Sequence, residues 1–141
     1  PDGEVSQGGY KWIEPVTLDF VNLAPGHFIM TNKVNYPRTI AYRRGDGAAD
    51  ELVLPGFTLK DSEVYINHQL TRPRIVLMGF KYADAARGRV FMQDRAGWML
   101  RSGRGWIIYF QAGHSAKDFE EPAYARILLN AVLYNPSTAG S

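Results

Sequence analysis

Residues 104–135, RGWIIYFQAGHSAKDFEEPAYARILLNAVLYN, decide how the C-terminal part of the chain folds. The aliphatic and aromatic run 106–110 predicts a short strand, and His114 follows it directly after a glycine. One amphipathic helix comes next; it is predicted to begin near Pro122 and to stop at Asn135, which precedes a proline. A strand that delivers a histidine at its carboxyl end is a common way to build a site in an α/β protein, because ligands collect there.

The expected helix has a wide apolar face. Glu120 and Glu121 stand just before it, where negative charge favours a helix N-terminus. Its apolar side chains recur every three or four residues, which is typical of a helix that lies on a sheet. Two rows make up this face: Ala123, Ile127 and Ala131, and then Tyr124, Leu128 and Val132.

The rest of the chain is predicted to form short strands separated by turns. Alternating or continuous apolar runs bounded by proline and glycine are typical of strands. The runs 98–101 and 106–110 are separated by four residues that include two glycines, which predicts a hairpin. The other predicted strands are 17–23, 28–30, 38–43, 52–54, 63–66, 74–78 and 89–92.

These elements together predict a β-rich α/β fold in which a C-terminal helix packs on a mixed sheet. A chain of 141 residues is long enough for one domain with a real core. We expect that single domain at residues 10–136. The polar, glycine-containing ends, 1–9 and 137–141, are predicted to be flexible tails.

Composition excludes several classes of function. The chain has no cysteine, which rules out disulfides, thiolate zinc sites and a cysteine nucleophile. A net charge of +2 is too small to indicate a nucleic-acid partner. No apolar run approaches the ~20 residues of a membrane helix, so no transmembrane segment is predicted. Nothing in the sequence points to a cofactor or a bound metal, and neither is predicted.

His114 is the strongest single candidate for a functional residue. A neutral imidazole at a sheet edge can transfer protons or bind a ligand near neutral pH. The alternative is a loop histidine that bonds nearby backbone and caps the following turn. Ser115 is a candidate ligand-binding residue, and it would be a nucleophile only beside an activating base. Its alternative role is to form a local turn or to cap the next segment.

Asp61 and Glu63 form the second candidate group. Positions two apart on a strand face the same side, so both carboxylates are predicted to project into one pocket. Paired carboxylates carry out acid–base chemistry on sugars. The alternative is that both are solvated acids at the start of a strand. Tyr65 is predicted either to contact a ligand or to fill the core.

The remaining candidates are rings. His27, His68 and His114 are the only histidines, but their wide spacing gives no local signature of a zinc site. His68 and Trp98 are predicted ligand-binding residues. Trp and Tyr are favoured at interaction surfaces because one end of each ring is apolar and the other polar. The aromatic side chains that could form such a platform or interface are Tyr10, Trp12, Trp98, Trp106 and Tyr109.

The segment 54–65, LPGFTLKDSEVY, and the C-terminal stretch quoted above resemble ThuA-like (trehalose-utilisation) proteins, a branch of the class I glutamine-amidotransferase-like α/β fold. Those proteins end in a glycine-rich turn, an apolar strand, Gly-His, a Phe-Glu-(Asp/Glu)-Pro start and a terminal helix. They also carry a Leu-Pro-x-Phe-x-x-x-Asp-Glu-x-Tyr element, into which this chain inserts Ser62 between the two acids. The resemblance covers residues 50–136.

The resemblance implies a partial ThuA-like, flavodoxin-like three-layer architecture. It also implies that His114, Asp61 and Glu63 lie at the site if the chain is an enzyme. Members of this family carry a longer N-terminal half that holds most of the parallel strands, and the sequence before residue 50 does not resemble it. The chain begins at Pro1 with neither an initiator Met nor a signal peptide. We therefore expect a shortened scaffold that is either a processed protein or a fragment.

Two functions from different classes follow. The first is a non-catalytic structural subunit, built on a shortened ThuA-like scaffold and packed against other protein chains of a larger complex. The second is a carbohydrate-active ThuA-like enzyme, or a sugar-binding domain, that acts on a glycoside or an oxidised sugar. The apparent loss of the N-terminal half and the inserted Ser62 favour the first. A sheet without its central strands needs something to cover it, and the segment 10–30 is the predicted contact.

Overall fold

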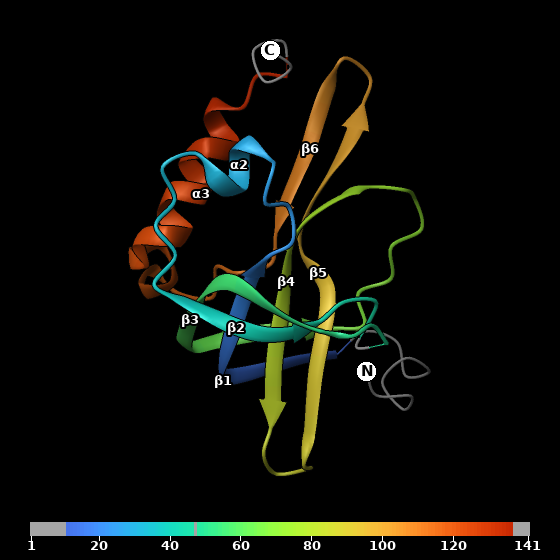
Figure 1. The fold of residues 1–141 in the computed structure, drawn as a ribbon, viewed down its shortest axis with the longest axis vertical. Coiled ribbons are helices and arrows are strands. Elements are labelled where there is room, and N and C mark those ends of the chain that lie inside the picture. Colours follow the sequence, from blue (N-terminus) through green and yellow to red (C-terminus); the bar gives the residue numbers. More distant parts are fainter. Residues whose placement is uncertain (1–10, 47, 137–141) are drawn as a thin grey trace.

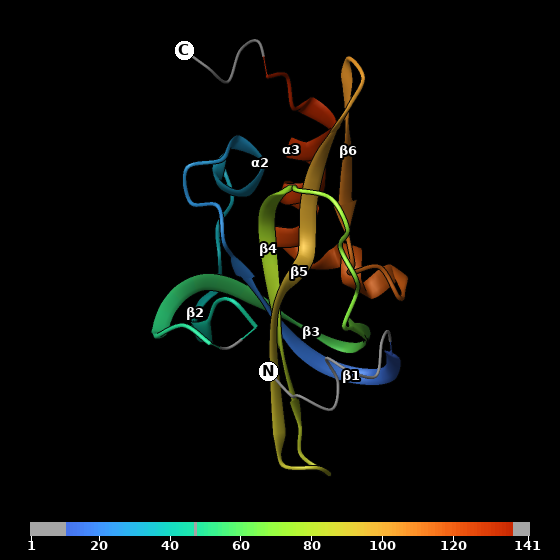
Figure 2. The same cartoon turned by 90° about the vertical axis from the view of Figure 1, so that its right-hand side faces the viewer.

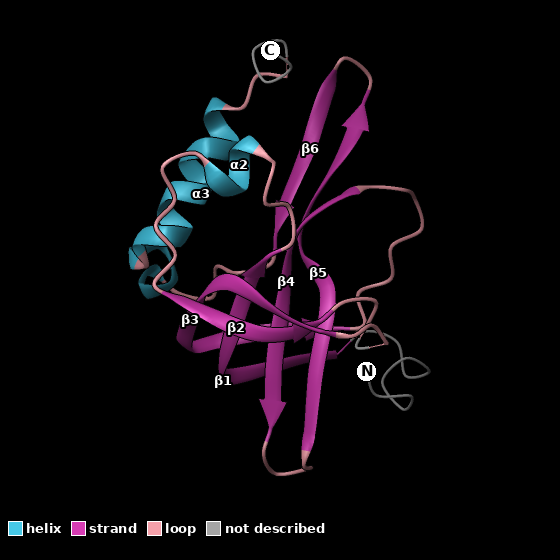
Figure 3. Cartoon of the chain, in the orientation of Figure 1, coloured by secondary structure: helices cyan, strands magenta, loops and turns pink. Residues whose placement is uncertain are grey.

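The computed structural model describes residues 11–46 and 48–136, so the predicted tails and Tyr10 lie outside the described residues. The strands form one sheet of order β2-β3-β1-β4-β5-β6, with helices on one side (Figures 1 and 3). The strands are β1 (Lys11–Asn22), β2 (Arg38–Arg43), β3 (Glu51–Ile66), β4 (Ile75–Asp84), β5 (Arg89–Ser102) and β6 (Gly105–Phe110). The helices are α2 (Phe28–Thr31), the 3-10 helix η1 (Ala116–Glu120) and α3 (Pro122–Leu133).

The prediction of a β-rich α/β chain with a C-terminal helix on its sheet is confirmed. The sheet itself differs from the expected mixed one, because every pair of neighbouring strands among the described residues is antiparallel. Parallel neighbours require a long crossover connection, usually a helix, whereas antiparallel neighbours can be joined by tight turns. Here β4, β5 and β6 follow one another through two such turns.

The predicted hairpin at the end of the sheet is confirmed. Ser102 on β5 pairs with Gly105 on β6, which leaves Gly103 and Arg104 as the loop. Gly103 has a φ of 55°, a left-handed backbone conformation that glycine adopts without the steric penalty of a side chain. Two-residue hairpin loops favour residues of this kind because their twist matches that of the strands.

Several predicted boundaries were wrong. Residues 28–30 form most of α2 instead of a strand; His27 caps this helix, since its Nδ1 accepts a hydrogen bond from the Ile29 N–H at 3.2 Å. A short apolar run cannot distinguish a strand from one buried helical turn, and the cap decides here. Two long strands each contain two of the predicted short ones. Strand β3 contains 52–54 and 63–66, and strand β5 contains 89–92 and 98–101.

Helix α3 covers the main core. Figure 1 shows α2 and α3 together on one side of the sheet, and the rotated view of Figure 2 shows α3 passing behind β4 and β5. Ala123, Tyr124 and Ile127 are buried against the sheet, as their spacing predicted. The predicted apolar face is narrower at its end, because Leu128 is half-buried and Val132 is 83% exposed.

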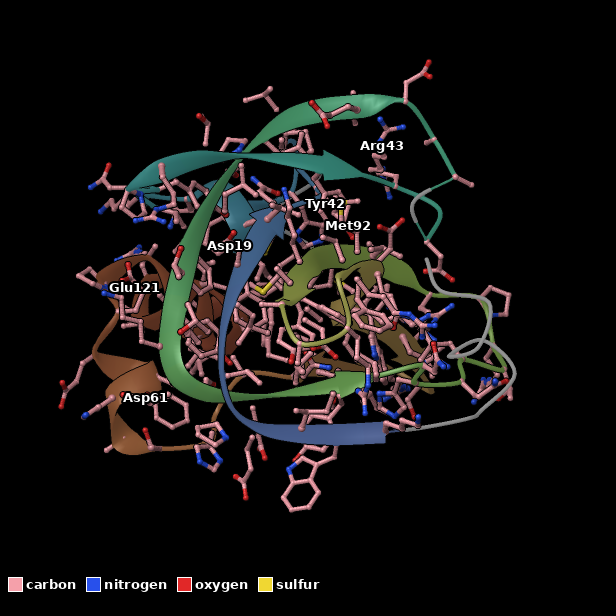
Figure 4. The ribbon with its side chains drawn as sticks, turned by 90° about the horizontal axis from the view of Figure 1, so that it is seen from below. Asp19, Tyr42, Arg43, Asp61, Met92 and Glu121 are labelled. Atoms are coloured by element: carbon pink, nitrogen blue, oxygen red, sulfur yellow. The ribbon has the colours of Figure 1, made fainter. Side chains whose placement is uncertain are left out.

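The sheet coils so that β2 lies across β4 and β5 (Figure 1). The buried Tyr42 donates its hydroxyl to Asp94 Oδ1 at 2.7 Å. Beside it, the Arg43 backbone N–H donates to the Met92 Sδ at 3.4 Å, and Figure 4 labels both residues. Gly79 of β4 is required at this crossing, because a Cβ there would collide with the Tyr42 hydroxyl. A second, smaller core forms at this crossing.

The N-terminal part of the described chain contributes to the centre of the sheet and to the core. Strand β1 is paired on both sides, with β3 and with β4, and it buries Leu18 and Phe20. Helix α2 buries Ile29 and Met30 in the same core as α3. This segment therefore supplies a central strand and part of the helical layer. Its first residues, 11–15, are mostly exposed, and the contact with a partner chain stays a prediction. None of the helices within residues 11–46 and 48–136 is long and apolar enough to span a bilayer.

Truncation of α3 at a buried position tests this packing. We expect Ile127→Ala to lower the free energy of unfolding by about 2–5 kcal/mol, because the side chain is fully buried and its removal leaves a cavity. The control on the same helix is Val132→Ala, which removes an exposed side chain and is expected to change stability by less than about 0.5 kcal/mol. Urea unfolding measures both. Equal losses in the two variants would contradict the observed orientation of α3.

Candidate functional site

The candidate site depends on two irregularities in the pairing of β1 with β3. Regular antiparallel pairing joins Leu18 to Leu59, but Val16 then pairs with Ser62, which leaves an extra residue on β3. Before that, Ile13 pairs with Val64, which leaves an extra residue on β1 and restores the original register. Two β-bulges on opposite strands therefore enclose a short offset segment. Bulges re-aim side chains and are common beside active sites.

Three ionisable side chains meet beside these bulges. Glu14 lies within the β1 bulge, Glu63 follows the β3 bulge, and His114 comes from the loop after β6. His114 Nδ1 lies 3.1 Å from Glu14 Oε2 and 3.4 Å from Glu63 Oε2. The side chains of Glu14 and His114 are about one-third exposed, so the group is open to solvent on one side. Two carboxylates and one imidazole are thus in contact at one place on the surface.

Two aromatic residues hold Glu63 in place. The Trp12 indole Nε1–H donates to Glu63 Oε2 at 2.7 Å, and the Tyr65 hydroxyl donates to Glu63 Oε1 at 2.9 Å. Burial alone would raise the pKa of Glu63, but these two hydrogen bonds and the adjacent His114 together hold that pKa below its usual value. Glu63 is therefore an ionised and oriented carboxylate. Trp12 is 53% exposed and borders the group with an open indole ring.

His114 is positioned by a buried carboxylate. Asp118 of η1 is 1% exposed, and its Oδ2 accepts hydrogen bonds from the His114 backbone N–H and from the Ser62 hydroxyl, both at 2.8 Å. Ser62 is the residue that the offset segment turns inward. Asp118 therefore joins the β3 bulge to the loop that carries His114. Ser115 occupies the N-cap position of η1, but its side chain makes no capping hydrogen bond.

Asp61, which the sequence paired with Glu63, is not one of the residues that meet at His114. Asp61 lies in the β3 bulge with a φ of 51°, and the buried Ser62 stands between it and Glu63. Asp61 instead lines a pocket of about 370 Å³ between β3 and η1, together with Lys60, Lys117 and Glu121. Figure 4 shows Asp61 and Glu121 on that side of the molecule.

The predicted ligand-binding rings form a second group. Trp98 and Tyr109 stack across the β5–β6 pair with ring centroids 5.0 Å apart, and the Arg74 guanidinium lies 4.1 Å from the Trp98 ring centroid. His68 contacts Tyr109 edge-on at 5.6 Å. Burial, and then the positive charges of Arg74 and Arg95, lower the pKa of His68. This group is held together by ring stacking and is distinct from the group around His114.

The three histidines do not converge within the described part of the chain. His27 caps α2 and contacts Tyr134, and burial lowers its pKa, so it serves the helix as a neutral acceptor. His68 belongs to the ring group, and only His114 lies among acids. A three-histidine metal site is therefore not formed by residues 11–46 and 48–136.

Sequence reasoning missed two residues of the site, Glu14 and Asp118. Nothing local distinguishes Glu14, because its role depends on a bulge set by the pairing of distant residues. Asp118 is the third residue of η1, a position from which an acid commonly reaches back to a backbone N–H at the start of a helix. That position was the available signal. Of the predicted candidates, the structure brings together His114, Glu63 and Tyr65, the last through its bond to Glu63.

The group around His114 can perform two kinds of chemistry. An imidazole beside an ionised carboxylate can take up and release a proton from a bound molecule. Glu14, Glu63 and His114 also each offer a ligand atom to a metal ion, and these atoms all lie within 4.8 Å of one another. Comparison with known proteins adds no assignment: no family model, no curated protein and no solved structure matches the chain.

Removing Asp118 tests its positioning role. We expect Asp118→Ala to lower the free energy of unfolding by about 1–3 kcal/mol, because the buried Ser62 hydroxyl and the His114 N–H lose their acceptor. The matched control is Glu120→Ala, which removes an exposed acid from the same 3-10 helix and is expected to stay within about 0.5 kcal/mol of wild type. Chemical denaturation compares them. An Asp118→Ala protein as stable as the control would show that this carboxylate holds nothing in place.

The lowered pKa of Glu63 predicts a pH-dependent contribution to stability. Because the folded-state pKa lies below the unfolded value, the ionised carboxylate stabilises the fold above pH 4.5, and this contribution disappears as the pH falls through the folded-state pKa. Glu63→Gln is therefore expected to be less stable than wild type at pH 7, and the difference should shrink towards about pH 3. Urea unfolding across this range measures it. A difference that is independent of pH would mean that the charge of Glu63 is not stabilised in the folded protein.

Proposed function

We propose that this chain is a carbohydrate-active or sugar-binding domain of the ThuA-like kind, whose site is the group Glu14, Glu63 and His114. The observation that carries the proposal is the convergence of two carboxylates and an imidazole from three separate elements. Sites that act on glycosides commonly use paired carboxylates. The exposed Trp12 ring beside the group would supply a face for a sugar to stack on.

The geometry gives each residue a specific role in this proposal. Glu63 is the anionic partner, because hydrogen bonds from Trp12 and Tyr65 keep it ionised and oriented. His114 is the proton carrier, since its Nδ1 faces both carboxylates. Glu14 is the more exposed of the two carboxylates and would contact a hydroxyl group of the sugar first. Asp118 acts on substrate only through His114, as a positioning residue.

Support for the ThuA-like relationship comes from the sequence. The chain keeps the Gly-His at 113–114 and the Phe-Glu-Glu-Pro at 119–122. One acid of the family's Asp-Glu pair, Glu63, lies in the proposed site, whereas Asp61 does not. The three-layer architecture of that family is not confirmed, and the antiparallel pairing of the described strands does not support it. The covered core favours this function over the subunit role that the sequence put first.

A second candidate function, a subunit that packs against other protein chains, is favoured by one surface. Leu129, Val132 and Leu133 on the outer side of α3 are 45%, 83% and 55% exposed. Strand β6 is an edge strand of the sheet and exposes Ile107. Exposed apolar side chains near an open strand edge suit a protein partner. Sedimentation of the isolated chain separates the two functions: a stable monomer at micromolar concentration that binds no hydrophobic dye would reject the subunit role.

Activity on sugars tests the proposed function. The chain is incubated with a panel of disaccharides, trehalose included, and with their oxidised keto derivatives, and product is followed by NMR. Turnover of at least one member is expected, and His114→Ala should lower kcat/KM by about 10²–10⁴, as for loss of a general acid–base, with little change in melting temperature.

The control is Asp61→Asn, which alters an acid on the same strand outside the group and should leave kcat/KM unchanged. Failure of the wild-type chain to bind or turn over any sugar of the panel would overturn the proposed function. Equal losses in His114→Ala and Asp61→Asn would move the site away from His114.

A further inference from the structure

The geometry points to a second capacity of the same three residues: a binding site for one divalent transition-metal ion, with Glu14, Glu63 and His114 as its protein ligands. Metal binding stands on the geometry alone and does not rest on the proposed action on sugars. The residues come from β1, β3 and the loop after β6, so the fold rather than a local sequence motif assembles them. No local sequence motif therefore marks this site.

The spacing of the ligand atoms fits a metal of this class. Zinc lies about 2.0–2.1 Å from histidine nitrogen and about 2.0–2.2 Å from carboxylate oxygen, so tetrahedral ligands stand about 3.3–3.5 Å apart and octahedral ones about 3.0 Å apart. The observed separations from His114 Nδ1 are 3.1 Å to Glu14 and 3.4 Å to Glu63. These two separations suit one ion, and all three ligand atoms lie within 4.8 Å of one another.

The ligand types narrow the choice of metal. One imidazole nitrogen and two carboxylate oxygens suit zinc, cobalt, nickel or manganese, whereas calcium and magnesium prefer oxygen ligands alone. Three protein ligands with an open side leave room for water in the remaining position, as in catalytic zinc sites. The partial exposure of Glu14 and His114 provides that open side.

Groups around the ligands strengthen the assignment. Ligating carboxylates in metal sites are usually hydrogen-bonded by outer residues that fix their orientation. Glu63 has two such donors, the Trp12 indole and the Tyr65 hydroxyl, which approach its two different oxygens. The backbone of His114 is fixed independently by Asp118. The absence of cysteine from the chain removes any competing thiolate ligand.

Calorimetric titration of the chelator-treated chain with Zn²⁺ tests the inference, with Co²⁺ as a spectroscopic probe. The wild-type chain is expected to bind one equivalent of either ion, and Co²⁺ should produce visible absorption bands typical of a low-coordinate site. His114→Ala and Glu14→Gln are expected to weaken binding more than about a hundredfold, and Trp12→Phe about tenfold, as for loss of an outer donor. Circular dichroism shows which variants keep the fold, and Glu63→Gln provides an isosteric third ligand variant.

Asp61→Asn is the matched control, because it removes a nearby carboxylate outside the group, and its affinity should equal that of wild type. No saturable binding by the folded wild-type chain at millimolar Zn²⁺ or Co²⁺ would overturn the metal site, and so would unchanged affinity in the three ligand variants. The sugar panel is run separately on the metal-free and metal-loaded chains. Metal binding without sugar turnover would support the metal site and reject the proposed function. Sugar turnover without metal binding would support the proposed function and reject the metal site.

Discussion

The paired bulges in strands β1 and β3 are the constraint on which the site depends. Regular pairing would run unbroken from Leu18 and Leu59 to the end of the strands, with side chains alternating strictly between the two faces. The structure instead adds one residue on β3 and then one on β1, so the register shifts and returns within a few residues. The long strands thereby keep their apolar face on the core on both sides of the offset. Within it, Ser62 turns inward, and Glu14 and Glu63 reach the same imidazole.

The offset and the His114 loop are linked by a single buried carboxylate. Asp118 accepts one hydrogen bond from Ser62 inside the offset and another from the backbone of His114. Loss of a hydrogen bond to a buried carboxylate lowers the stability of the fold, because the remaining partner is left as an unsatisfied polar group. Helix α3 begins immediately after η1 and packs on the sheet through Tyr124 and Ile127. The packing of the C-terminal helix on the sheet and the position of His114 in the site therefore both depend on where η1 lies.

The parts of the fold that local sequence determines could be predicted. The hairpin loop at Gly103, the strand at 38–43 and the C-terminal helix follow from turn residues, periodicity and caps, which act over a few residues. The direction of the strands could not be predicted, because pairing between distant segments decides it. The one-turn helix at 28–31 could not be predicted either, because a short apolar run fits a strand as well as a helix. His114 and Glu63 were recognised as candidates from their positions.

The acids around His114 illustrate what sequence reasoning cannot supply. Alternation along a strand predicted that Asp61 and Glu63 act together, but the acid that joins Glu63 beside His114 comes from β1. Glu14, which has no local signal, takes the place that Asp61 was expected to fill. The most direct test is therefore the β1–β3 register in solution, measured by interstrand backbone NOEs. We expect Val16 to contact Ser62, and contacts of Val16 with Asp61 in a continuous regular ladder would contradict the account.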